Sequence, residues 1–206
     1  MSPITDLLLH GAKQMRVPLK PQQLAQLEAF LLLIQKWNRA YNLVGAQDTQ
    51  TLIQKHLLDC LAIAPYITDG PVLDVGSGAG LPGIPLAIAH PDISFTLLDS
   101  NGKKTRFMRQ AAIELQLENV DVAQSRVEDY TSQPLYKLVL SRAFAPLPEA
   151  LKLLAQHCVT EGQIGIMLGE KPEQLPQSTE LSYTANHKLV VPGLDSKRHL
   201  LIASKI

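Results

Sequence analysis

The glycine-rich segment Leu73–Gly83 is the part of this 206-residue chain whose residue types most clearly suggest chemistry. An aspartate opens it, and glycine then takes every second position: Asp74, Gly76, Gly78 and Gly80. Glycine lacks a Cβ atom and tolerates positive φ, so a ligand can lie directly against such a backbone. Because the segment continues the short apolar run Val72–Val75, we expect a ligand site at the carboxyl end of a strand.

The loop fits two classes of ligand. Its first pattern, D-x-G-x-G-x-G, resembles the first motif of S-adenosylmethionine-dependent methyltransferases. Its second pattern, G-x-G-x-x-G, consists of Gly78, Gly80 and Gly83, and Asp99 follows about 20 residues later, as in a dinucleotide site. Asp99 would bind ribose hydroxyl groups in both cases, so it does not separate them. A glycine-rich turn without a ligand is a third possibility.

The negative charge of Asp74 distinguishes between the two candidate classes of ligand. A dinucleotide places its pyrophosphate at the N-terminus of the following helix, where a nearby carboxylate would be misplaced. S-adenosylmethionine has no phosphate but carries an ammonium group and a sulfonium. Asp74 can help to hold such a cation directly or through water, so the loop favours S-adenosylmethionine as the cofactor.

Short apolar runs alternate with helices after Gly70-Pro71. The predicted strands are 72–75, 94–98, 120–124, 137–140 and 163–168, and the predicted helices are 82–90, 102–117 and 148–157. This alternation predicts a parallel sheet with helices on both faces. Two more strands, 183–190 and 199–204, have only a loop between them and should pair antiparallel. The predicted fold class is α/β: a Rossmann-like S-adenosylmethionine methyltransferase fold with a mostly parallel seven-stranded sheet, a C-terminal antiparallel hairpin and an N-terminal helical extension.

The N-terminal part, residues 1–66, is predicted to be a helical extension packed on the core, with residues 67–206 as the methyltransferase domain. In 21–43, apolar residues recur at steps of three and four, Pro21 suits a helix start and Gly45 a helix stop. A further helix is predicted from about Thr49 to Tyr66. The aromatic residues of the first helix interleave with leucines, which favours core packing over base stacking: Phe30, Trp37 and Tyr41.

The charge balance argues mildly against a role in binding bare nucleic acid. Lys plus Arg and Asp plus Glu both number 19, giving a formal net charge of zero, whereas proteins that hold nucleic acid by neutralising phosphates are usually basic. The two cysteines, Cys60 and Cys158, do not make a disulfide framework. The N-terminus lacks the pattern of a secretory signal, and no apolar stretch reaches about 18 residues. We therefore expect a soluble cytoplasmic protein.

Further segments narrow the class to a family: Trp37–Leu43, His56–Asp59, Leu81–Leu86, Gln124–Glu128 and Ser141–Phe144. In this order and with these gaps the chain resembles the bacterial glucose-inhibited division protein B family (RsmG). Those enzymes methylate N7 of one guanine in the 530 loop of 16S ribosomal RNA. The resemblance covers nearly the whole chain and implies S-adenosylmethionine as cofactor and 16S rRNA as partner.

The resemblance also implies cofactor contacts at Gly76, Leu81, Val127, Glu128 and Arg142. These add to Asp74, Gly78 and Gly80 of the loop and to Asp99, which closes the second predicted strand. Val127 and Glu128 follow the third predicted strand, where a backbone group or a carboxylate would read an adenine edge. The chain departs from the family after the fifth strand, where members often read Leu-Lys-Gly. Here the residues are Met167-Leu168-Gly169, and whether Lys171 substitutes for the missing lysine stays open.

Methyl transfer to guanine N7 is an in-line displacement at a sulfonium carbon. N7 carries a lone pair and no proton, so we expect no catalytic acid or base; the enzyme must align the two reactants and exclude water. Arg142 is expected to place the substrate base by hydrogen bonding or stacking. Because the product ring is cationic, an aspartate or backbone carbonyl is better suited than an arginine to stabilise it.

The candidate RNA contacts are His56, Lys103, Arg106, Arg126 and Arg198. A structural, hydrogen-bonded histidine is an equal alternative for His56, and a metal site with Cys60 is not expected because two ligands do not make a site. Lys103, Arg106 and Arg109 form a stripe at helical spacing, for which a solvated helix face is an equal alternative.

Three other functions stay open. A methyltransferase acting on a small molecule or a protein would suit the neutral charge. An NAD-dependent oxidoreductase is supported by G-x-G-x-x-G alone, without a later His/Asp or Tyr-x-x-x-Lys arrangement. A non-catalytic binding module would not need the intact loop and Arg142. For the leading function, neutral charge favours a small-subunit ribonucleoprotein particle over free rRNA as partner, and we expect a monomer without metal or membrane contact.

Overall fold

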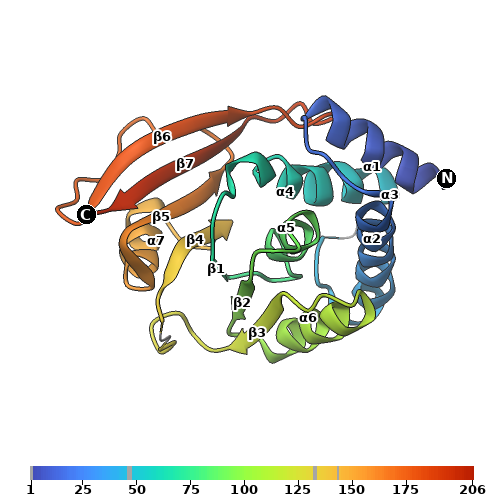
Figure 1. The fold of residues 1–206 in the computed structure, drawn as a ribbon, viewed down its shortest axis with the longest axis horizontal. Helices are drawn as coiled ribbons and strands as arrows, with labels where there is room; N and C mark the ends of the chain where they lie inside the picture. Colours follow the sequence, from blue (N-terminus) through green and yellow to red (C-terminus); the bar gives the residue numbers. More distant parts are fainter. Residues whose placement is uncertain (1, 46–47, 132–133, 143) are drawn as a thin grey trace.

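A computed structural model describes residues 2–45, 48–131, 134–142 and 144–206. A seven-stranded sheet with the order β3-β2-β1-β4-β5-β7-β6 forms its centre (Figure 1). The strands are β1 (Val72–Val75), β2 (Phe95–Asp99), β3 (Val120–Gln124), β4 (Tyr136–Arg142), β5 (Cys158–Leu168), β6 (Leu181–Leu189) and β7 (Arg198–Lys205). The strands β1 to β5 run parallel, and β7 pairs antiparallel with both β5 and β6. The predicted fold class and its C-terminal hairpin are confirmed.

Helices cover the two faces of the sheet unequally (Figure 1). On one face, α5 (Gly83–Ala89) packs on β2 and α6 (Gly102–Glu114) packs on β2 and β3, while α2 (Pro21–Tyr41) lies on both helices and α1 (Pro3–Gln14) lies on α2. On the other face, α7 (Leu147–Ala155) packs on β4 and β5. The described residues of the β3–β4 and β5–β6 connections contain no helix, so much of this second face is covered by loops.

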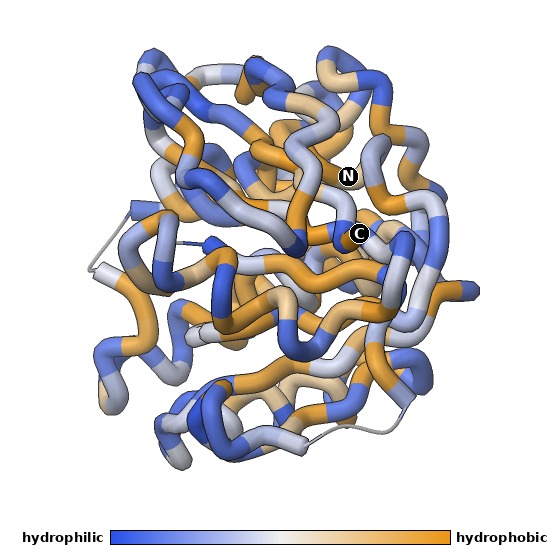
Figure 2. The backbone as a smooth tube through the Cα atoms, turned by 90° about the vertical axis from the view of Figure 1, so that its left-hand side faces the viewer, coloured by the Kyte–Doolittle hydropathy of each residue, from blue (hydrophilic) through white to orange (hydrophobic). Residues whose placement is uncertain are grey.

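The N-terminal extension shares its hydrophobic core with the sheet. One cluster joins Leu8 of α1 and Leu27 of α2 to Leu97 of β2 and Leu140 of β4. Phe30, which is fully buried, stacks on Phe107 of α6 with ring centroids 6.2 Å apart. Figure 2 shows the corresponding hydrophobic stretches running through the interior, with hydrophilic stretches at turns. The division into domains at residues 66 and 67 stays a prediction, although the extension is packed on the core as expected.

The aromatic stripe of α2 belongs mainly to this core. Trp37 packs edge-on against Phe107 with ring centroids 5.5 Å apart, so core packing is confirmed for Phe30 and Trp37. Tyr41 contacts Trp37 but is 40% exposed and lies at the margin.

The predicted stop at Gly45 is wrong, because α2 ends at Tyr41. Asn42 follows it in the left-handed conformation with a φ of 48°. Asparagine tolerates this conformation and can end a helix as glycine does.

The predicted continuous helix from Thr49 to Tyr66 is also wrong. The segment divides into α3 (Thr49–Leu52), the π-helical segment η1 (Ile53–Leu58), α4 (Asp59–Leu61) and the 3-10 turn η2 (Ala64–Tyr66). The backbone N–H of Asp59 donates to the carbonyl of Gln54, five residues earlier, which gives the wider π turn. Such turns occur frequently at functional sites. No helix in the described part of the chain is long and apolar enough to cross a membrane.

Phe30→Ala should lower the free energy of unfolding by about 3–5 kcal/mol, because it empties a closed position between α2 and α6. Leu32→Ala is the matched control on the same helix, since Leu32 is 50% exposed, and should change it by less than about 0.5 kcal/mol. Urea unfolding followed by circular dichroism measures both. Equal midpoints for the two variants would show that α2 does not stabilise the sheet.

Candidate functional site

The buried side chain of Asp74 holds the glycine loop in place through hydrogen bonds. Its side chain is fully buried, and Oδ2 accepts hydrogen bonds from Ser77 Oγ at 2.6 Å and from the backbone N–H of Gly83 at 2.9 Å. These bonds tie the end of β1 to the start of α5. Between them the chain turns through three glycines with positive φ: Gly76 (72°), Gly78 (60°) and Gly80 (76°).

Burial raises the pKa of Asp74 to about 6, although the hydrogen bonds from Ser77 and Gly83 favour the ionised form. The other oxygen, Oδ1, is buried and has no hydrogen-bond partner among the described residues. A buried acceptor without a partner is costly. Asp74 therefore holds the loop with one oxygen, while its second oxygen has unused acceptor capacity.

Two neighbouring cavities open at this loop and share Gly76. The smaller, of about 290 Å³, contains the predicted residues Asp99, Arg126, Val127 and Glu128. Asp99 Oδ2 accepts from the backbone N–H of Gly78 and Oδ1 from that of Asn101, both at 2.8 Å. Each carboxylate oxygen has further acceptor capacity, so Asp99 is fixed in place and still able to bind a hydroxyl group.

Phe144 closes the smaller cavity beside the loop. A Cβ atom on Gly76 would lie 2.8 Å from Phe144 Cδ2. The glycine therefore provides space as well as a positive φ. Sequence reasoning did not assign a role to Phe144, and the signal available for it was its place in the Ser141–Phe144 segment, of which Ala143 lies outside the described residues.

The larger cavity, of about 470 Å³, brings together residues from distant parts of the chain. Gly76, Gly78 and Leu81 form the loop side. The predicted residues His56, Arg142 and Arg198 lie around it with Lys55 and Asp59. The π-helical segment, the end of β4 and the start of β7 thus meet at one place.

Asp59 is a further site residue that sequence reasoning missed. It is 2% exposed; its Oδ1 accepts from Arg198 Nε at 2.9 Å and its Oδ2 from Arg142 Nη1 at 3.3 Å. The available signal was a lone carboxylate in the otherwise apolar run 57–64, at the end of the His56–Asp59 segment. We define Asp59, Arg142 and Arg198 as the Asp59 cluster, which carries one net positive charge.

His56 lies beside this cluster as a neutral ring. Burial, and then the positive charges of Arg142 and Lys55, lower the pKa of His56 to about 4. Its Nδ1 atom is buried and has no hydrogen-bond partner among the described residues. His56 therefore offers the cavity an uncharged ring. No group of three potential metal ligands occurs in the described part of the chain.

Some predicted residues line neither cavity. Lys103 and Arg106 are exposed on α6, whereas their neighbour Lys104 lines the smaller cavity. Gly80 packs against Ile84 and shapes the turn. At the position of the missing family lysine, Leu168 lines the larger cavity with Gly169, and Lys171 does not.

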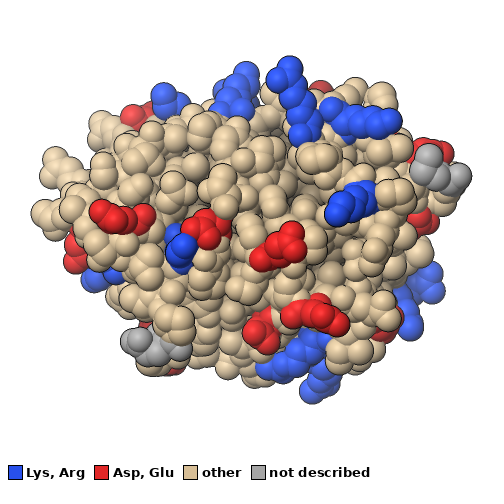
Figure 3. Space-filling view, viewed as in Figure 1, with Lys and Arg blue, Asp and Glu red and all other residues tan. Residues whose placement is uncertain are grey.

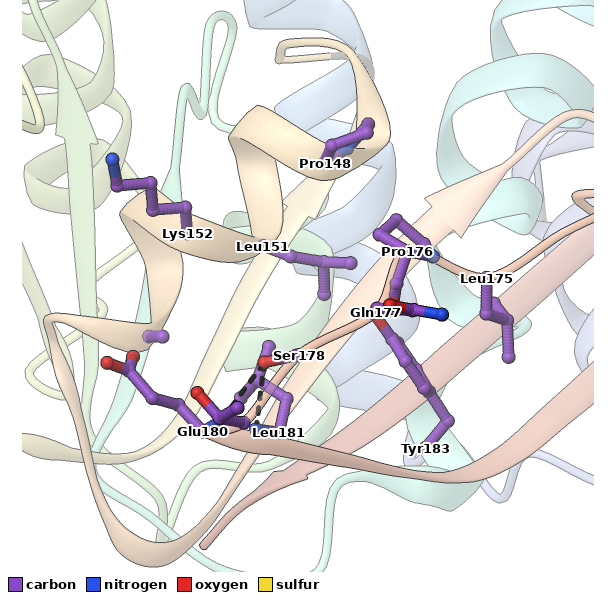
Figure 4. A pocket seen from close by; sticks show the side chains of 12 residues that line it. Pro148, Leu151, Lys152, Leu175, Pro176, Gln177, Ser178, Glu180, Leu181 and Tyr183 are labelled. Carbon is purple, nitrogen blue, oxygen red and sulfur yellow. Dashed lines mark hydrogen bonds between the residues drawn. The ribbon is translucent and has the colours of Figure 1, made fainter.

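A hollow larger than either of these cavities lies elsewhere, between α7 and the β5–β6 connection (Figure 4). It measures about 890 Å³. Polar groups in it bond within the loop: Ser178 Oγ accepts from the N–H groups of Glu180 and Leu181, and Tyr183 donates to the carbonyl of Pro176. It holds none of the predicted residues, so size alone does not locate the site.

Charges of both signs are interspersed on the face shown in Figure 3, in keeping with the zero net charge.

Comparisons with known proteins agree with this geometry. The GidB family, described as rRNA small subunit methyltransferase G, matches residues 23–201. The chain is 43% identical over 202 residues to the Ribosomal RNA small subunit methyltransferase G of Marinobacter nauticus, covering 96% of this chain and 94% of that protein. It is 40% identical over 212 residues to the protein of the same name from Escherichia coli, covering 100% of both.

Among solved structures, the fold is similar to that of a magnesium protoporphyrin IX methyltransferase from Synechocystis with bound SAM. The TM-score is 0.60 at 14% identity, covering 86% of this chain and 97% of that one. At this identity the likeness concerns the fold.

Gly76→Ala should lower the midpoint of urea unfolding, because the positive φ costs an L-residue about 1–2 kcal/mol and the new methyl group meets Phe144. Gly169→Ala is the control in the same site, since a Cβ atom there has nothing within 4 Å. That variant should keep or slightly raise the midpoint. The reverse order of the two midpoints would contradict the assigned role of Gly76.

Proposed function

We propose that this chain, which belongs to the GidB family of rRNA small subunit methyltransferases G, transfers a methyl group from S-adenosylmethionine to N7 of a guanine in the 530 loop of 16S rRNA. The observation that carries the proposal is the pair of joined cavities at the glycine loop. One holds the carboxylates of Asp99 and Glu128, and the other holds the arginines of the Asp59 cluster. A cofactor and a base can therefore meet across Gly76.

The residues of the smaller cavity fit the adenosine part of the cofactor. Asp99 would bind the ribose hydroxyls, and Val127 and Glu128 would contact the adenine. The methionine part would lie along Gly76 toward Leu81 and Arg142. The free Oδ1 of Asp74 is suited to an ammonium group, directly or through water. When bound, S-adenosylmethionine supplies an electrophilic methyl carbon on a sulfonium.

The larger cavity fits the target guanine. Arg142 lies at its wall and would place the base, while Leu168 provides an apolar surface that helps to exclude water. We assign no catalytic acid or base, because guanine N7 already carries a free lone pair. His56 is neutral above a pH of about 4 and is not needed as a proton donor. Catalysis then rests on alignment of the methyl carbon with N7.

The basic groups at the two cavities support RNA as the substrate despite the zero net charge. Lys55, Arg142 and Arg198 line the larger cavity, and Lys104 and Arg126 line the smaller. A local concentration of cations is what phosphate contacts require. We further propose that Lys103 and Arg106 extend this surface, and that the protein acts as a cytoplasmic monomer on a small-subunit ribonucleoprotein particle, which supplies contacts that bare RNA lacks.

The affinity for S-adenosylmethionine should fall as the pH drops through about 6. Ionised Asp74 attracts the cationic cofactor, and protonation removes that attraction; the raised pKa of about 6 places this change between pH 7.5 and 5. If the ionised form alone binds, the Kd rises about tenfold at pH 5. Calorimetry on the wild type and Asp74→Asn checks this, with unfolding curves as a control for folding. The same acid-side loss in both variants would exclude Asp74 as its source.

Transfer of radiolabelled methyl from S-adenosylmethionine to small ribosomal subunits, with label mapped to a guanine N7, tests the function itself. Arg142→Ala should reduce the single-turnover rate by about 100-fold through misplacement of the base, with the fold intact. Lys137→Ala removes an exposed cation at the opposite end of the same strand and should react normally.

Absence of label from rRNA, with cofactor still bound, would instead favour a small-molecule or protein substrate. Near-normal turnover in Arg142→Ala would remove this arginine from the mechanism.

A further inference from the structure

Three chain segments are held together by one buried carboxylate. Asp59 follows the π-helical segment, Arg142 is the last residue of β4, and Arg198 is the first residue of β7. Each oxygen of Asp59 accepts from a different guanidinium group, at 2.9 and 3.3 Å. A buried charge requires partners of this kind, because taking it out of water is expensive. The positions of both arginines therefore depend on Asp59.

Each arginine keeps donors for a ligand. Arg142 uses Nη1 for Asp59 and, at 3.5 Å, for the carbonyl of Lys55. Arg198 uses Nε for Asp59 and Nη1 for Ser196 Oγ and the carbonyl of Lys197. A guanidinium has five N–H donors, so N–H groups are left over on each. The side chains of Arg142 and Arg198 are 21% and 23% exposed, and both line the larger cavity.

Guanine offers a matching acceptor. Its N7 edge carries two acceptors, N7 and O6, whereas adenine has an amino donor in place of O6. N7 must keep its lone pair free for the methyl carbon. An arginine can therefore donate to O6 but not to N7. An adenine in the same position would set its N6 amino donor against an N–H donor. An arginine held at this wall thus distinguishes the two purines without blocking the reacting nitrogen.

The charge of the cluster matters as the reaction proceeds. The guanine ring becomes cationic when N7 gains the methyl group. Two unpaired arginines would oppose that change with two positive charges, whereas the Asp59 cluster presents one. Asp59 therefore fixes the positions of the arginines and also lowers the positive electrostatic potential at the base.

We propose that Asp59 is a positioning residue that holds Arg142 against O6 of the target guanine, with Arg198 as the second support, and offsets their charge while the ring becomes cationic. This inference rests on the proposed function, because it takes a guanine as the base in the larger cavity. Asp59 acts through Arg142 and does not touch the reacting atoms.

The test compares Asp59→Asn with Asp69→Asn. Both exchange an ion-paired aspartate for an amide, but Asp69 pairs with Lys137 at the surface, with side chains 63% and 54% exposed. Asp59→Asn should lower the single-turnover rate of methyl transfer on the order of 100-fold, with less than about threefold change in the Kd of S-adenosylmethionine. Asp69→Asn should match the wild type in both measurements.

A double-mutant cycle separates positioning from a merely structural role. In an Arg142→Ala background, Asp59→Asn should cost less than about threefold in rate, because the residue that it positions is gone. Arg198→Met leaves a one-to-one pair of Asp59 with Arg142. It should lower the rate by about tenfold, an intermediate loss, and it supplies the measurement if Asp59→Asn does not fold.

Each outcome decides the inference. A normal rate in a folded Asp59→Asn, an equal loss of rate in both Arg142 backgrounds, or a normal rate in Arg198→Met would overturn it. Normal N7 label in the wild type together with any of these results leaves the proposed function intact. A wild type that does not label guanine N7 overturns the proposed function and this inference with it.

Discussion

The carboxylate of Asp74 is the constraint on which the conformation of the glycine loop depends. One of its oxygens fixes Ser77 and Gly83, so the loop can turn through positive φ and still enter α5 in register. Keeping this carboxylate buried is unfavourable by on the order of 3 kcal/mol, as its pKa of about 6 indicates. This cost falls at the start of the glycine loop, and it is not fully offset there, since Oδ1 is left without a partner among the described residues.

The net charge of this molecule does not reveal its local charge distribution, because the fold brings basic residues from distant segments together. Zero net charge argued mildly against RNA, yet five basic residues from five separate segments lie around the two cavities: Lys55, Lys104, Arg126, Arg142 and Arg198. Two of the acidic residues among them are engaged: Asp59 in ion pairs and Asp99 with backbone N–H groups. Electrostatic steering depends on such local fields more than on the sum of charges.

Patterns that are local in sequence were predictable, and contacts between distant segments were not. The bounds of β1 and β3 match the predictions, because short apolar runs between turn residues determine them. The division of the predicted helix at 49–66 was missed, since no residue between Thr49 and Ala64 breaks a helix by itself. The π turn places Lys55, His56 and Asp59 at the larger cavity, where the partners of the Lys55 carbonyl and of Asp59 come from β4 and β7. Asp59 went unassigned for the same reason, because its partners lie 83 and 139 residues away.

The two cavities draw on different parts of the chain, and this division bears on specificity. Residues at the carboxyl ends of β1, β2 and β3, together with Phe144 after β4, line the smaller cavity, at the edge of the sheet where proteins of this fold bind ligands. The larger cavity needs the N-terminal extension and the C-terminal hairpin, joined through Asp59. Because the extension also shares its core with β2 and α6 through Phe30 and Phe107, the larger cavity is built on the same hydrophobic core as the sheet that carries the glycine loop.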